Sequence, residues 1–214
     1  MNLPNYITLS RIVMIPLLIW ILSSSRFAGI NGERETLAAG LFVAASLTDF
    51  LDGYMARRRG QITTMGMLLD PLADKLMITA AFVTLVQFNP RIVPAWMAVI
   101  IIGREFLVSG LRSIAAQEGF TIEASDLGKF KMVVQIVSVT AAILDVRWPV
   151  WNLGSGFVFP MDLIARVSIW FMVLLSLASA ADYFAAFWSK IDRRVKRRRA
   201  FVLSRRRKRD VAAT

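Results

Sequence analysis

The sequence predicts an all-α, polytopic membrane protein with six transmembrane helices. Of its 214 residues, 56% are hydrophobic, and they form runs long enough to cross a bilayer. The positive charge is concentrated, because twelve of the 26 Lys and Arg residues follow Ser189. A basic run beside an apolar helix is typical of the cytoplasmic side of a membrane.

The predicted spans cover residues 7–24, 37–56, 67–87, 92–111, 131–148 and 163–187. The first run could be a secretory signal, but five more spans follow it, so we interpret it as a membrane helix. Asn89-Pro90 predicts the break before the fourth span. We expect one membrane domain, residues 1–189, followed by a basic tail, residues 190–214.

The distribution of basic residues predicts the orientation of these spans. An even number of spans places both termini on one side of the membrane. If that side is the cytoplasm, eighteen basic residues lie inside and four outside, as the positive-inside rule requires. We therefore predict a multi-pass protein of the bacterial inner (plasma) membrane whose tail contacts membrane lipids. Nucleic acid is not an expected partner, because Phe201 is the sole aromatic residue in the basic run.

Four carboxylates interrupt the apolar sequence between residues 49 and 74. Asp49 and Asp52 are three residues apart, and Asp70 and Asp74 are four apart, so each pair shares one helix face. Both pairs fall at the predicted cytoplasmic ends of their spans. Carboxylates within a membrane are costly and usually functional, and convergence on cations explains them most simply.

The residue types that are missing restrict the chemistry of this site. The chain has no Cys and no His, which leaves oxygen ligands and therefore magnesium, manganese or calcium. Two such pairs on adjacent helices can hold two divalent cations, an arrangement that serves phosphoryl or nucleotidyl transfer. The alternatives are a cation or proton transporter that uses the carboxylates as a pathway, and a non-catalytic scaffold, which would not explain the spacing.

The stretch D-x2-D-G-x2-A-R-x8-G-x3-D-x3-D, residues 49–74, resembles the signature of the CDP-alcohol phosphotransferases. PNYITLSR near the start, GREFLVSGLR and ASDLGKFK extend the resemblance over most of the chain. It departs at Met132, where Thr is expected. The resemblance implies six transmembrane helices, a homodimer and a site facing the cytoplasm that uses two divalent cations, Mg²⁺ or Mn²⁺.

The resemblance also implies roles for individual residues. Asp49, Asp52, Asp70 and Asp74 would be the metal ligands, and Asp74 would also be the catalytic base. The CDP-linked substrate would contact Asn5, Thr8, Gly53, Ala56, Arg57 and Gly66.

The later motifs resemble the branch of the family that uses glycerol 3-phosphate as acceptor. The expected reaction transfers the phosphatidyl group of CDP-diacylglycerol to glycerol 3-phosphate, giving phosphatidylglycerophosphate and CMP. Candidates for binding the acceptor's phosphate are Lys75, Arg104, Arg112 and Lys129. A family member with another acceptor, such as inositol phosphate or serine, is the nearest alternative.

Overall fold

The computed structural model describes residues 3–24, 32–59, 64–121, 127–152 and 158–211. Side chains are described over 9–24, 32–48, 72–121, 130–150 and 158–192. The elements in chain order are α1 (Leu3–Ser23), α2 (Glu33–Arg59), α3 (Thr64–Phe88), α4 (Ala95–Gln117), α5 (Leu127–Asp145), β1 (Trp151–Asn152), β2 (Val158–Phe159) and α6 (Met161–Val211). The expectation of an all-α protein is therefore confirmed, apart from two very short strands.

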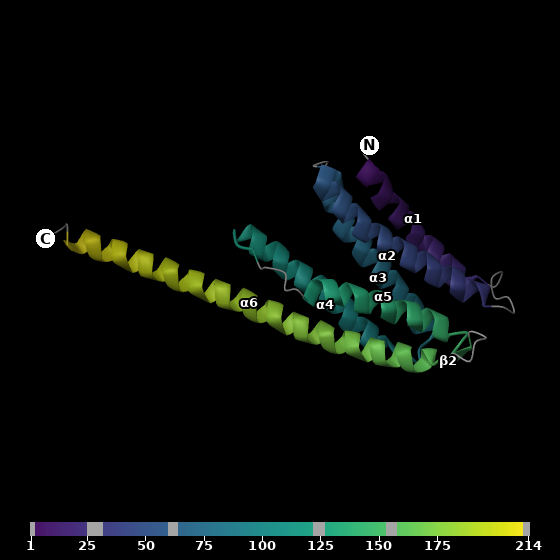
Figure 1. Cartoon of the computed structure of the whole chain (residues 1–214). Helices are drawn as coiled ribbons and strands as arrows, with labels where there is room; N and C mark the ends of the chain where they lie inside the picture. Colours follow the sequence, from purple (N-terminus) through teal and green to yellow (C-terminus); the bar gives the residue numbers. More distant parts are fainter. Residues whose placement is uncertain (1–2, 25–31, 60–63, 122–126, 153–157, 212–214) are drawn as a thin grey trace.

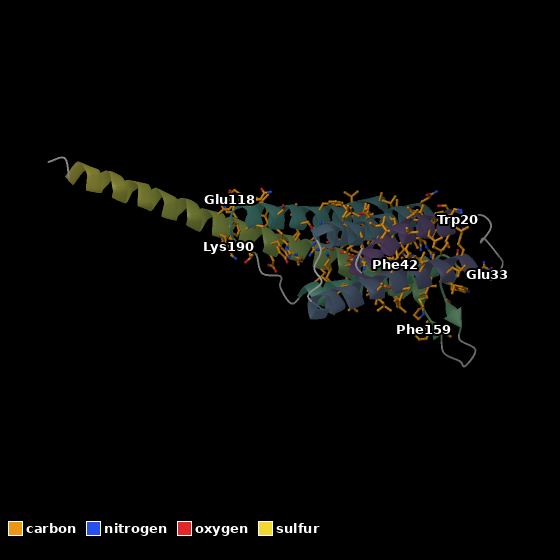
Figure 2. All side chains as sticks on the ribbon, turned by 90° about the horizontal axis from the view of Figure 1, so that it is seen from above. Trp20, Glu33, Phe42, Glu118, Phe159 and Lys190 are labelled. Carbon is orange, nitrogen blue, oxygen red and sulfur yellow. The ribbon has the colours of Figure 1, made fainter. Side chains whose placement is uncertain are left out.

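Consecutive helices run in opposite directions, so their connections alternate between the two ends of the bundle (Figure 1). Glu118, after α4, and Lys190, on α6, lie near one end, whereas Trp20, Glu33 and Phe159 lie near the other (Figure 2). The amino-terminal end of α1, the last turn of α2 and the first turn of α3 lie at the same end of the bundle as the carboxyl-terminal end of α4 (Figure 1). Each predicted span corresponds to one helix.

The bundle is held by two groups of helices that share α5. Helix α1 packs against α2 and α3, while α6 packs against α4 and α5. Contacts of α5 with α2 and α3, and of α3 with α4, join the groups. Phe42, Phe82, Ile143 and Met172 are fully buried members of one continuous apolar core, and van der Waals packing of such side chains holds these groups together.

Apolar side chains also cover much of the outer surface. Val13, Val99, Leu174 and Trp188 each expose more than 59% of their area, and similar residues occur on the other helices. Within the described residues, Met161–Asp192 is the one helix segment long and apolar enough to cross a membrane by composition, and Leu9–Ser23 is a shorter apolar helix. Six membrane spans thus remain a prediction.

Several boundaries differ from the expected ones for simple physical reasons. Helix α1 begins at Leu3 rather than residue 7, because Pro4 lies in the first turn, where backbone N–H groups have no helical partner. Helix α4 begins at Ala95 rather than residue 92, with Pro94 as its extended N-cap. Helix α6 runs without a break through residue 190 into the basic tail (Figure 1).

The hairpin between α5 and α6 has no counterpart in the predicted spans. Its strands pair antiparallel, with Trp151 opposite Phe159.

At this end of the bundle, the buried Asn89 donates hydrogen bonds to Ala142 O at 3.0 Å and to Asp145 Oδ2 at 2.9 Å. Arg91 forms an ion pair with Asp162 at 2.9 Å. These contacts tie the α3–α4 connection to the end of α5 and the start of α6.

Candidate functional site

The helices place the two carboxylate pairs at matching depths in the bundle. Asp49 lies ten residues before the end of α2, and Asp74 lies ten residues after the start of α3. At 1.5 Å per residue, each is about 15 Å along its helix from the α2–α3 connection. Asp52 and Asp70 are likewise each about 10 Å from it. Helix α1 packs against both α2 and α3.

Asp74 opens into a polar cavity of about 220 Å³ at this end of the molecule. The cavity lies between α3, α4 and α5, and its lining is Asp74, Lys75, Ile78, Glu105, Lys131, Met132 and Gln135. Two carboxylates, two ammonium groups and an amide thus surround a space large enough for a small phosphorylated molecule. The cavity is partly open and combines apolar side chains with several charged groups, and such a combination is typical of a ligand-binding site.

The wall of the cavity is stabilised by a charged network across three helices. Glu105 Oε1 accepts a hydrogen bond from Arg104 Nη1 at 3.0 Å and forms a close ion pair with Lys131 Nζ. Arg104 also donates a short hydrogen bond through Nη2 to Ser179 on α6. The side chains of Arg104 and Lys131 are about nine-tenths buried, so these pairs are screened little by water.

A second, smaller cavity of about 20 Å³ is also lined by Asp74. Its polar lining groups are those of Arg11, Ser46, Asp74 and Gln135, and Met132 lines both cavities. Arg11 is 3% exposed. This cavity therefore brings a buried guanidinium from α1 to the carboxylate helix α3.

The structure brings together part of the predicted site. Asp74 and Lys75 line the larger cavity. Arg104 does not line it but donates a hydrogen bond to Glu105, which does. Arg112 is exposed, eight residues further along α4. The other predicted residues lie outside the described side chains: Asn5, Thr8, Asp49, Asp52, Gly53, Ala56, Arg57, Gly66, Asp70 and Lys129. Among the described residues, no three His, Cys, Asp or Glu side chains gather into a group that could hold a metal.

Three lining residues had no role in the sequence-based prediction: Glu105, Lys131 and Gln135. Glu105 follows Arg104 directly in an apolar helix, and an acidic residue beside an arginine in such sequence is a signal of an ion pair. Lys131 is the first residue of the predicted span 131–148, and no role at the site was predicted for it. Gln135 lies one helical turn after Lys131, and that i,i+4 spacing is the available signal.

The arrangement can bind an anion and accept a proton within one space. Lys75 and Lys131 supply positive charge for a phosphate group. The carboxylate of Asp74 can accept a proton from a hydroxyl group held near them. A cavity of this kind can bind a phosphorylated molecule and accept a proton from one of its hydroxyl groups.

Comparison with known proteins identifies the group to which this bundle belongs. Residues 1–178 match the family model of the CDP-alcohol phosphatidyltransferases. The chain is 40% identical over 198 residues to the CDP-diacylglycerol–glycerol-3-phosphate 3-phosphatidyltransferase of Bacillus subtilis, covering 89% of this chain and 97% of that protein. The protein of the same name from Rickettsia typhi is 36% identical over 86% of this chain and 96% of its own length.

The fold agrees with this result. The chain superimposes on the crystal structure of the phosphatidylinositol phosphate synthase of Mycobacterium tuberculosis with a TM-score of 0.61 and 18% identity, covering 87% of this chain and 90% of the other. At that identity the likeness concerns the fold alone. The chain belongs to the CDP-alcohol phosphatidyltransferase family, and the family predicted from residues 49–74 is confirmed.

Proposed function

We propose that the chain is a phosphatidyltransferase that moves the phosphatidyl group of CDP-diacylglycerol to glycerol 3-phosphate, releasing phosphatidylglycerophosphate and CMP. The observation that carries this proposal is the cavity that joins Asp74 to Lys75 and Lys131 in a member of this family. Relatives that bear the name of this reaction match the chain over almost their whole length. The volume and charge of the cavity suit a phosphorylated three-carbon acceptor.

In the proposed reaction, Asp74 takes the proton of the primary hydroxyl of glycerol 3-phosphate. The hydroxyl oxygen forms a bond to the phosphorus that carries diacylglycerol, and the bond between that phosphorus and the CMP oxygen breaks. Lys75 and Lys131 bind the acceptor's own phosphate from two helices, together with Arg104, Arg112 and Lys129 at the same end. Holding both reactants in one cavity supplies much of the rate enhancement.

The donor set at this end suits two divalent cations, Mg²⁺ or Mn²⁺. Asp49, Asp52, Asp70 and Asp74 would hold them, because the pairs lie at equal depths on α2 and α3 and the chain offers no His or Cys ligand. When bound, the cations neutralise diphosphate charge and make CMP a better leaving group. We assign contacts with the CDP-linked substrate to Asn5, Thr8, Gly53, Ala56, Arg57 and Gly66.

We place the enzyme in the bacterial inner membrane with six spans, both termini in the cytoplasm and the cavity facing the cytoplasm. The outward-facing apolar residues support this placement, since a bilayer, unlike water, is a favourable environment for them. Residues 1–189 form the membrane domain, residues 190–214 form the tail, and the active unit is a homodimer.

A competition experiment tests the acceptor. Purified protein receives CDP-diacylglycerol with equal concentrations of glycerol 3-phosphate, inositol phosphate and serine, and the lipid products are separated and identified. We expect phosphatidylglycerophosphate as the dominant product. A dominant product from either other acceptor would retain the reaction class and refute the acceptor.

A further inference from the structure

One functional group of the proposed acceptor has no binding partner assigned in the proposed reaction. Glycerol 3-phosphate carries a phosphate, the primary hydroxyl that reacts, and a secondary hydroxyl between them. Lys75 and Lys131 account for the phosphate, and Asp74 accounts for the reacting hydroxyl. The secondary hydroxyl would lie in the same cavity, where a buried donor without a partner is costly.

Glu105 is the second carboxylate in the lining of this cavity. A carboxylate repels a phosphate group, so Glu105 is not expected to bind the phosphate of the acceptor. It is expected to bind another group of that molecule. Its Oε1 is shared by Arg104 and Lys131, which neutralises much of its charge and fixes its position. An ionised carboxylate is solely a hydrogen-bond acceptor, and a hydroxyl is the donor that the acceptor molecule offers.

The location of Glu105 is also suitable. It is on α4, whereas Asp74 is on α3 and Lys131 is on α5, so the three groups approach the cavity from three sides. A molecule held at its phosphate by Lys131 and at its primary hydroxyl by Asp74 has its middle carbon between them. The side chain of Glu105 is 21% exposed and lines the cavity.

We propose that Glu105 is a specificity-determining residue that accepts a hydrogen bond from the secondary hydroxyl of the acceptor. The site would thereby select a phosphorylated molecule with two adjacent hydroxyl groups over one with the reacting hydroxyl alone. This inference rests on the proposed function. The competing explanation is that Glu105 does no more than join α4 to α5 through Lys131.

Two acceptors distinguish these explanations: glycerol 3-phosphate and 3-hydroxypropyl phosphate, which lacks the secondary hydroxyl. For the unaltered protein in detergent, with CDP-diacylglycerol, we expect kcat/KM to favour glycerol 3-phosphate by about 10- to 150-fold, the range for a hydrogen bond to a charged group. In Glu105→Ala this preference should fall to within about threefold. Glu105→Gln, which keeps a neutral acceptor, should give an intermediate ratio.

Ser179→Ala is the matched control. It removes the partner of Arg104 on α6 and disturbs the same network without altering the lining of the cavity, so the ratio should stay at its original value. A purely structural role for Glu105 lowers the rates with both acceptors and leaves their ratio unchanged in both Glu105 variants. That result, or equal use of both acceptors by the unaltered protein, overturns the proposal.

The experiment distinguishes an error in the proposed function from an error in the role assigned to Glu105. If the unaltered protein releases no CMP with either acceptor, the proposed function is wrong. If it uses glycerol 3-phosphate but the ratio does not depend on Glu105, the function stands and this assignment is wrong. Should Glu105→Ala prove too unstable to purify, the ratio measured with Glu105→Gln decides.

Discussion

Among the described residues, Asp74 is the one charged residue that lines both cavities. It lines the larger cavity together with Lys75, Glu105 and Lys131, and the smaller one together with Arg11. A carboxylate in this position can accept the proton of a bound hydroxyl. The cationic side chains of Lys75, Lys131 and Arg11 in the same cavities can attract the anionic groups of the substrates. Its role is therefore the most direct one to test by substitution.

Asp74→Asn keeps the size of the side chain and removes its ability to accept a proton. We expect kcat to fall by about 10²- to 10⁴-fold, the usual contribution of a general base, with the melting temperature little changed. Asp162→Asn, at the opposite end of the bundle in an ion pair with Arg91, is the control and should retain full turnover. Comparable turnover in both variants would remove Asp74 from the mechanism.

The basic residues around the cavity are expected to act on the acceptor and not on the lipid. Lys131→Met keeps an unbranched side chain that is one atom shorter and removes the charge. Arg104→Ala and Arg112→Ala remove the two arginines of α4. Each should raise the KM for glycerol 3-phosphate, by about 10- to 150-fold for a direct charge-assisted contact, and leave the KM for CDP-diacylglycerol nearly unchanged. Kinetics with each substrate varied in turn provide the test. A rise confined to the CDP-lipid would place the acceptor's phosphate elsewhere.

Some of the residues around Asp74 could be predicted from the sequence, and others could not. Asp74 is the last residue of a motif of fixed spacing and Lys75 follows it directly, so their position at the site was predictable. Glu105 and Lys131 are 26 residues apart on different helices, and nothing in the sequence states that α4 and α5 turn these residues toward each other. Their pairing follows from helix packing, which a single sequence does not encode in a readable pattern.

At the scale of elements, the helices were predictable and their ends less so. Long apolar runs predict the number and order of the helices. In an apolar environment the backbone N–H and C=O groups of each run must hydrogen-bond to one another, and a helix satisfies them within the run. The extension of α6 to Val211 has another origin: Lys and Arg are good helix formers, so the charged tail continues a helix already begun. Strands as short as Trp151–Asn152 carry no detectable sequence pattern.

The charged end of α6 should be dispensable for the reaction. Near that end, Lys190 donates a hydrogen bond to Thr121 O at 2.5 Å, and its ammonium group lies 6.0 Å from the centre of the Phe120 ring. A chain truncated after Lys190 keeps these contacts, so turnover in detergent should be largely intact while binding to vesicles of anionic lipid weakens. Lys190→Ala in the full chain is the matched variant for loss of the contacts. Lost turnover in a folded truncated protein would show that the tail takes part in catalysis.

At the scale of the whole molecule, the alternating connections predict which residues share a side of the membrane. The chain contains no cysteine, so a single introduced thiol can be labelled without background. Glu118→Cys should react from the cytoplasmic side alone and Glu33→Cys from the opposite side alone, because these residues lie at opposite ends of the bundle (Figure 2). A membrane-impermeant reagent applied to sealed inside-out and right-side-out vesicles makes the measurement. Labelling of both residues from the same side would contradict six spans.

The central claim is that a metal-dependent cavity transfers phosphatidyl groups, and one assay tests it directly. Purified protein is mixed with CDP-diacylglycerol, labelled glycerol 3-phosphate and Mg²⁺ or Mn²⁺, and released CMP and labelled lipid are both counted. We predict one CMP for each labelled lipid, and no release in excess chelator or in Asp49→Ala, Asp52→Ala or Asp70→Ala. Full turnover in excess chelator, or release of CMP without labelled lipid, would contradict the account.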